Sequence, residues 1–212
     1  MTAWRGFSAA FREFPYHGGL VYSGPQQLGP ANLLWAESTG FAATMVGFPY
    51  DDLNGWRAIY PPEIFVQQFE KVADGFDRAL AELGATLARL TGEGDSAQGQ
   101  GTTPAHRRAL AEEYCVGEAA AIHFRSSANQ ARFVLARQAL AAARNMDDAV
   151  PHRAAMDKVL QDEIVLARRL HAIQSRDSRI GFEASNQYYY VPVDLMEKVL
   201  NCRNLLAHAV PK

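Results

Sequence analysis

From Pro61 onward, apolar residues recur every three or four positions, which is the spacing of one face of an α-helix. The apolar positions are Phe65, Phe69, Val72, Phe76, Leu80, Leu83, Leu87 and Leu90. Pro61 and Pro62 suit the first helical turn, because the N–H groups there have no partner within the helix. We therefore expect a long helix that ends before residues 92–102, GEGDSAQGQGT, a low-complexity stretch that predicts a mobile loop.

Three further segments show helical periodicity. Thr103 followed by Pro104 is typical of a helix start, and we expect the second helix to run from there to about Asn145. The third helix is expected at residues 151–174, and a fourth starts near Pro192. The inner face of the second helix is rich in small residues, which allow close approach of a neighbour, so this helix is expected to lie centrally. The prediction is a mainly α protein, an antiparallel bundle of about four long helices.

Residues 1–60 differ in character from the rest of the chain. Short apolar runs at 19–22, 32–35 and 44–48 are separated by Gly-Pro and Phe-Pro pairs and are too short for helices. They predict short strands and ordered loops, which need the helices, or a sheet that this segment lacks, to bury both faces. We therefore divide the chain into a strand-and-loop segment, residues 1–60, and a helical bundle, residues 61–212.

Composition argues against several classes of function. The formal net charge is −2 and no dense Lys/Arg run occurs, so we expect no nucleic-acid partner. Cys115 and Cys202 cannot form a disulfide framework, and the sequence has neither a CxxC nor an HExxH motif, so we expect no metal site. It has no glycine-rich phosphate loop, so we expect no nucleotide cofactor. Without a signal-peptide pattern or an apolar run near the ~18 residues of a membrane span, we expect a cytoplasmic protein without a membrane partner.

The segment that joins the third and fourth helices is oversized and chemically rich. Residues 174–192, QSRDSRIGFEASNQYYYVP, are here named the clasp; a typical helix connection has about 2–8 residues. The structural interpretation is that arginine–carboxylate pairs and tyrosine rings hold one helix pair to the rest. The functional interpretation is that some of these groups face a ligand.

A second polar cluster lies just before the first long helix. Asp51 and Asp52 stand close to Trp56 and Arg57, so carboxylates, an indole and a guanidinium share one short loop. Sugar sites use this combination, because aromatic faces pack on the C–H surface of a pyranose while carboxylates and arginine bind its hydroxyls. The structural alternative is a capped, salt-bridged loop. An ion pair between neighbours Arg12 and Glu13 is a further structural expectation, worth about 0–1 kcal/mol at a surface.

Four stretches of the sequence together suggest a family: WRGFSAAFREFPY, GPQQLGPANLLW, TMVGFPYDDLNGWRAIYPPEIF and DSRIGFEASNQYYYVP. They resemble the C-terminal region of large bacterial proteins related to glycoside hydrolases, in which a catalytic barrel precedes a helical part. The resemblance implies that residues 1–60 are the last units of a barrel. Since the rest of the barrel is absent from this chain, catalysis would depend on residues elsewhere.

Three functional hypotheses follow. In the first, the chain is the carbohydrate-facing C-terminal part of a glycoside-hydrolase-like protein, with sugar contacts from Asp51, Asp52, Trp56, Arg57 and Glu183. In the second, it is a helical-bundle scaffold or oligomerisation module without a small-molecule site. A complete small hydrolase is the third. Glycoside hydrolysis needs two carboxyl groups facing one bond. The candidate carboxylates are Glu13, Asp51, Asp52, Asp177 and Glu183, and the sequence assigns none of them as acid or nucleophile.

Overall fold

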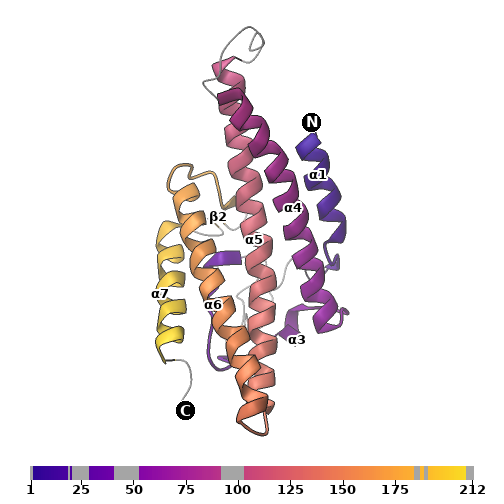
Figure 1. Cartoon of the computed structure of the whole chain (residues 1–212), viewed down its shortest axis with the longest axis vertical. Helices are drawn as coiled ribbons and strands as arrows, with labels where there is room; N and C mark the ends of the chain where they lie inside the picture. The colour runs from indigo at the N-terminus through magenta and orange to yellow at the C-terminus, as the bar shows by residue number, and fades with distance from the viewer. Residues whose placement is uncertain are drawn as a thin grey trace.

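A computed structural model describes residues 2–18, 20, 29–40, 53–91, 103–183, 187–188 and 191–208. The protein is mainly helical, as predicted, and four long helices dominate it (Figure 1). These are α4 (Pro62–Thr91), α5 (Pro104–Ala142), α6 (Met146–Gln174) and α7 (Pro192–His208). No helix in the described ranges is both long enough and apolar enough to cross a membrane.

The helix starts follow from their capping residues. The Thr103 side chain accepts a hydrogen bond from the backbone N–H of His106, and Pro104 opens α5, as the sequence indicates. α6 begins earlier than expected, because Asn145 caps it by accepting a hydrogen bond from the N–H of Asp148. Pro151 therefore lies inside α6 near its start, rather than at its first position.

α5 lies in the middle of the molecule, as its small residues predict. It has α4 on one side and α6 on the other, and α7 packs along α6 (Figure 1). The chain reverses its direction between α5 and α6 within residues 143–145 (Figure 1). Most of the residues that α5 buries are small, and among them are Gly117, Ala121, Ser126, Ala128 and Ala131.

The expected strands of residues 1–60 are wrong wherever the structure describes that segment. It holds the helices α1 (Thr2–Ala10) and α3 (Leu53–Trp56) and the 3-10 turns η1 (Phe11–Glu13) and η3 (Gly29–Ala31). Residues 32–35 are irregular rather than extended in a sheet. The expected runs at 44–48 and 21–22, and the expected loop at 92–102, lie outside the described residues.

Helix α1 packs closely on α4 because the residues at their contacts are small. A Cβ atom built on Gly75 of α4 would lie 2.4 Å from the Cβ of Ala10, and one on Gly6 would lie 2.8 Å from the Cβ of Ala79. Phe7, between the two contacts, is buried and stacks on Phe76 at 4.9 Å. The helix α1 therefore replaces the strands and loops that the sequence predicts for this part of the chain.

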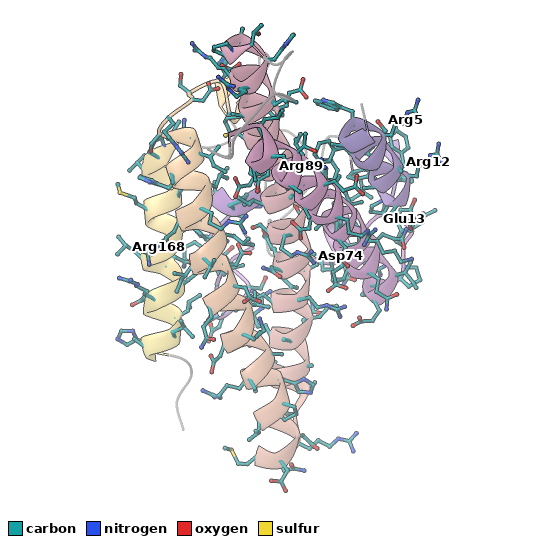
Figure 2. The ribbon with its side chains drawn as sticks, turned by 45° about the horizontal axis from the view of Figure 1, so that its top comes forward. Arg5, Arg12, Glu13, Asp74, Arg89 and Arg168 are labelled. Atoms are coloured by element: carbon teal, nitrogen blue, oxygen red, sulfur yellow. The ribbon has the colours of Figure 1, made fainter. Side chains whose placement is uncertain are left out.

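One expected ion pair, between Arg12 and Glu13, can be compared with this interface. Glu13 lies 3.7 Å from Lys71 of α4 and accepts a hydrogen bond from Gln68, so it does not form the expected pair with Arg12. Figure 2 shows Arg12 pointing away from α4. Also on α4, Glu70 and Glu63 both bind Arg132 of α5, at 2.9 Å and 2.7 Å.

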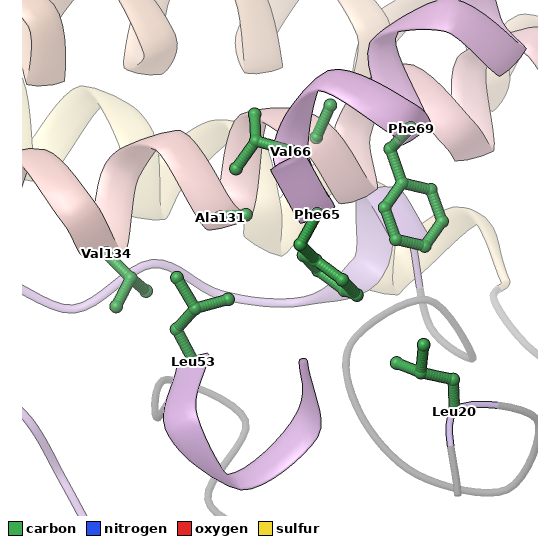
Figure 3. Packing of buried hydrophobic residues seen from close by; sticks show 8 residues of the cluster. Leu20, Leu53, Phe65, Val66, Phe69, Ala131 and Val134 are labelled. Atoms are coloured by element: carbon green, nitrogen blue, oxygen red, sulfur yellow. The ribbon is translucent and has the colours of Figure 1, made fainter. Parts of the chain in front are cut away.

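One core cluster shows how the N-terminal segment covers the bundle. Leu20 and Leu53 lie over Phe65 and Phe69 of α4, and Ala131 and Val134 of α5 complete the cluster (Figure 3). Burial of one such side chain contributes about 1.5–3 kcal/mol. Residues from the segment before residue 60 therefore form part of the same core as α4 and α5.

The described strands lie within the clasp. β1 (Phe182–Glu183) pairs antiparallel with β2 (Gln187–Tyr188), and Glu183 stands opposite Gln187. Ile180, just before β1, is buried against Ala119 and Ile122 of α5.

Candidate functional site

The structure describes only part of the sugar site that the sequence predicts. Asp51 and Asp52 lie outside the described residues. Trp56 is the last residue of α3, and Glu183 belongs to β1; for both, only the backbone is described. Arg57 is engaged with its own turn, because it donates to the Asn54 side chain at 3.1 Å and to the Tyr60 carbonyl at 2.6 Å.

The described anchors of this predicted site lie at different levels of α5. Leu53 of α3 belongs to a core cluster that includes Ala128, Ala131 and Val134 of α5, whereas Ile180, before Glu183, belongs to one that includes Ala119 and Ile122. The nearest α5 members of these two clusters, at 122 and 128, are six positions apart, about 9 Å along a helix. The grouping of Asp51, Asp52, Trp56, Arg57 and Glu183 stays a prediction, because four of its five side chains are not described.

Within the clasp, one carboxylate and one guanidinium are locked together. Arg179 donates to Asp177 through Nε at 2.8 Å and through Nη2 at 2.6 Å, and its backbone N–H donates to the same carboxylate at 3.0 Å. These bonds from Arg179 lower the pKa of Asp177 to about 2. Arg179 also lies 3.8 Å from the carboxylate of Glu112 on α5. The clasp thus contains the arginine–carboxylate pairing that its structural interpretation expects.

A groove of about 700 Å³ lies between the clasp, α5 and α1. Asp177 and Arg179 line it from the clasp, Glu112 and Glu113 from α5, and Trp4 from α1. The exposed indole of Trp4 is held by a hydrogen bond from its Nε1 to Glu113 at 2.6 Å. An aromatic face, three carboxylates and a guanidinium therefore meet at one hollow.

Apolar side chains and one histidine form the rest of this groove. Phe124, Val116 and Ala120 of α5 contribute apolar surface, and Ile180 contributes more from the clasp. His123 also lines the groove. Its ring fits against Gly29, where a Cβ atom would lie 2.3 Å from Nδ1. Gly29 has a φ of +47°, so this contact uses both the missing side chain and the left-handed backbone of glycine.

Sequence reasoning identified only part of this groove. It predicted arginine–carboxylate pairs in the clasp and named Asp177 as a candidate carboxylate, but it missed Trp4, since it did not predict α1. Glu112 and Glu113 look like an ordinary solvent-facing helix pair in the sequence. The WRGF stretch at the start of α1 is the sequence feature that could have indicated this part of the groove. It places the indole of Trp4 two residues before Gly6, which permits close packing of α1 on α4.

A second polar network lies between α5, α6 and α7, and the ion pair at its centre is fully buried. Lys198 of α7 lies 3.0 Å from Glu163 of α6, and both side chains are 0% exposed. Glu163 also accepts hydrogen bonds from Ser126 at 2.7 Å and from Asn129 at 2.8 Å. Lys198 donates to the carbonyl of Asn32. Buried charges need partners of this kind, and these two are closed off from solvent, so the network stabilises the fold and is not a binding site.

The same helices hold the backbone of residues 32–35. The Asn201 side chain accepts from the N–H of Leu34 at 2.9 Å and donates to its carbonyl at 2.8 Å. Arg137 donates to the carbonyl of Trp35 at 3.0 Å. Side chains of the bundle therefore supply partners that a neighbouring strand would supply in a sheet, which is why this segment is not a strand.

In the described parts of the chain, no three His, Cys, Asp or Glu side chains are arranged so that they could hold one metal ion. Burial raises the pKa of Cys202 to about 11, and burial also raises the pKa of Cys115. Both thiols are free. Their chemistry is that of protonated, packed side chains.

Comparison of the chain with protein-family models, with curated proteins and with solved structures found no match. The resemblance to the C-terminal region of glycoside-hydrolase-like proteins therefore stays an expectation from the sequence motifs. The functional argument rests on the groove itself.

Proposed function

We propose that this chain is the carbohydrate-facing part of a glycoside-hydrolase-like protein, and that the groove between α1, α5 and the clasp binds the sugar. The observation that carries the proposal is the meeting of Trp4 with Glu112, Glu113, Asp177 and Arg179 at one hollow. This site differs in its residues from the predicted one, although both rely on the same kind of chemistry.

The groove offers both kinds of contact that a sugar requires. The exposed Trp4 ring provides an apolar face for the C–H surface of a pyranose, and its bond to Glu113 fixes the orientation of that ring. The paired Asp177 and Arg179 hold each other in place before a ligand arrives. A preorganised site loses less conformational entropy on binding, so these internal bonds favour affinity.

The proposal assigns no catalytic residue within this chain. A general acid for glycoside hydrolysis is a carboxyl group whose pKa is raised, so that it holds a proton near neutral pH. Asp177 has the opposite property, because Arg179 lowers its pKa to about 2. The chemistry of the groove therefore supports binding, and hydrolysis would depend on residues supplied from elsewhere.

A second candidate function is a helical scaffold, in which α4 to α7 form an antiparallel bundle that presents a surface to another protein. Exposed apolar side chains on α7 favour it: Val193, Met196 and Leu200. This function requires no sugar, so the two candidates predict different results in a sugar-binding experiment.

The test is a thermal-shift screen of the purified chain against monosaccharides and oligosaccharides, with Trp4→Ala as the site variant and Trp35→Ala as the control. Trp35 is also exposed, but it does not line the groove. A sugar at 100 times its dissociation constant adds about 2.7 kcal/mol of stability, or about 5–11 °C in Tm for a chain of this size. We expect a shift in the parent and in Trp35→Ala, and its loss in Trp4→Ala.

Two outcomes would contradict the proposal. If no sugar in the panel shifts the midpoint of a cooperative transition, the chain has no sugar site of its own and the scaffold candidate stands. If a sugar shifts Trp4→Ala as strongly as the parent, binding takes place away from the groove. The predicted loop is then tested by Asp52→Ala and Trp56→Ala.

A further inference from the structure

Helix α7 carries a second apolar face that the bundle does not cover. Val193, Met196 and Leu200 are exposed by 59%, 51% and 66%, and their spacing of three and four residues places them along one side. The opposite side of α7 is already buried, through Leu195 and Cys202. A surface helix of a monomer needs only one apolar face, so the outer face requires a separate explanation.

This outer face borders a groove between α6 and α7 with a volume of about 600 Å³. Its exposed apolar surface comes from Met196, Val199 and Leu200 of α7, above a floor formed by the buried Leu195 and Ala167. The groove shares no lining residue with the one that contains Trp4.

The charged residues of the groove are all basic. Arg168 and His171 line it from α6, and Arg203 lines it from α7, with no acidic residue among the lining side chains. Within the part of the chain that the structure describes, neither Arg168 nor Arg203 forms an ion pair, whereas the adjacent Arg169 binds Glu118 at 2.7 Å. Figure 2 labels Arg168 on α6. Two arginines on opposite walls therefore remain available for acidic groups.

We propose that the α6–α7 groove binds an amphipathic α-helix of a protein partner, whose apolar stripe is flanked by Asp or Glu. The apolar residues of the groove would receive the stripe, and Arg168 and Arg203 would each pair with a carboxylate at its edge. The inference goes beyond the sugar-binding proposal and uses different residues, so either can fail without the other.

The geometry favours a helix over an extended peptide. An extended peptide binds by adding a strand to the free edge of a sheet, where backbone N–H and C=O groups are unpaired. Both walls of this groove are helices, whose interior N–H and C=O groups are bonded within the helix. Recognition must therefore come from side chains, which is how a helix is held in a groove.

The experiment uses the full chain and a designed probe. The probe is a fluorescein-labelled peptide of about 18 residues, or about five helical turns, with a leucine stripe flanked by glutamates. Binding is measured by fluorescence anisotropy against the parent, Leu200→Asp, and the double variant Arg168→Glu/Arg203→Glu. Val150→Asp is the matched control, because Val150 is an exposed residue of α6 that lies 168 − 150 = 18 positions from Arg168, about 27 Å along the helix.

We expect saturable binding to the parent and to Val150→Asp, and binding at least about tenfold weaker for Leu200→Asp. The charge-reversed double variant should lose the acidic peptide and instead bind a counterpart with lysines in place of the glutamates. That exchange of specificity would not arise if the substitutions merely unfolded the protein, and circular dichroism of each variant confirms the helix content.

Four outcomes would overturn the inference. The first is no saturable binding of the acidic peptide, and the second is binding that neither Leu200→Asp nor the charge reversal changes. The third is a dimer in light scattering that Leu200→Asp dissociates, which would make a second copy of the chain the occupant. The fourth is binding to vesicles of anionic lipid, lost in the charge-reversed variant, without binding of the peptide, which would make the face a membrane contact.

Discussion

The buried pair of Lys198 and Glu163 gives the sharpest prediction for the stability of the fold. Substituting Lys198 by Met keeps a long unbranched side chain but removes the ammonium group. The carboxylate of Glu163 then keeps its hydrogen bonds from Ser126 and Asn129 and loses the positive charge that lies 3.0 Å away. The carbonyl of Asn32 loses the hydrogen bond that Lys198 donates.

The magnitude follows from the complete burial of both groups. Breaking a buried ion pair by removing one partner costs about 3–5 kcal/mol, because the remaining charge has neither water nor its counter-ion. For a chain of this size, each kcal/mol lowers Tm by about 2–4 °C, so we expect Lys198→Met to lower Tm by about 6–20 °C. The double variant Lys198→Met/Glu163→Gln should lose about 1–3 kcal/mol less stability than the sum of the two single changes, because the glutamine amide leaves no unpaired charge in the core.

Urea denaturation and calorimetry of the parent, the two single variants and the double variant measure this coupling. Lys158→Met is the matched control, because Lys158 pairs with Asp162 at 2.6 Å while the two side chains are 70% and 44% exposed. That exposed pair should contribute only about 0.3–0.5 kcal/mol. A loss below about 1 kcal/mol for Lys198→Met, or additive effects in the double variant, would refute the reasoning that the buried charges depend on each other.

Three further predictions test other parts of the molecule. Gly75→Ala should destabilise the protein by about 1–3 kcal/mol in urea denaturation, because the new methyl group overlaps α1. The control Gly84→Ala, whose methyl group would lie 3.4 Å from the nearest side chain, should be neutral or stabilising by up to about 1 kcal/mol. Equal effects of the two substitutions would show that α1 does not pack on Gly75. The pKa of Asp177 is lowered in the folded state, so the stability from its pairing with Arg179 is present above its ordinary pKa of 3.8 and is lost as the pH falls toward about 2. NMR titration should find the folded midpoint near 2, and Arg179→Met should return it toward 3.8; an unchanged midpoint would exclude Arg179 as the cause. Cys202, with its pKa raised to about 11, should resist a thiol reagent at neutral pH until guanidinium unfolds the chain, and reaction at the rate of a free thiol would contradict its burial.

The sequence predicted the long helices well because their signals are local. The stripe from Phe65 to Leu90 repeats with the helical period, and Thr103 and Pro104 lie beside the residues they cap. It failed for α1, because the packing of Gly6 against Ala79 joins positions 73 residues apart (79 − 6 = 73), and single-sequence periodicity contains no such information.

The groove has the same types of residue as the site that the sequence predicts, but not the same residues. Carboxylates, an arginine and a tryptophan do meet at one groove, yet Trp4 and Glu113 are 109 positions apart in the chain. The sequence favoured Asp51, Asp52, Trp56 and Arg57 because they are neighbours in one short loop. A site that forms only when α1 packs on α4 and α5 therefore cannot be predicted from the sequence before that packing is known.

The polar interior of α5, α6 and α7 follows from what those helices enclose. A bundle of regular helices can bury an apolar core alone, because helical backbone groups satisfy one another. Residues 32–35 are irregular, so their N–H and C=O groups need partners from outside. Lys198 and Asn201, three positions apart and thus on one face of α7, bind the backbone of Asn32 and Leu34. Because Lys198 is buried where it binds this backbone, its positive charge needs a buried acidic partner, and that partner is Glu163. The ion pair at the centre of the bundle is thus a consequence of holding a non-helical segment among helices.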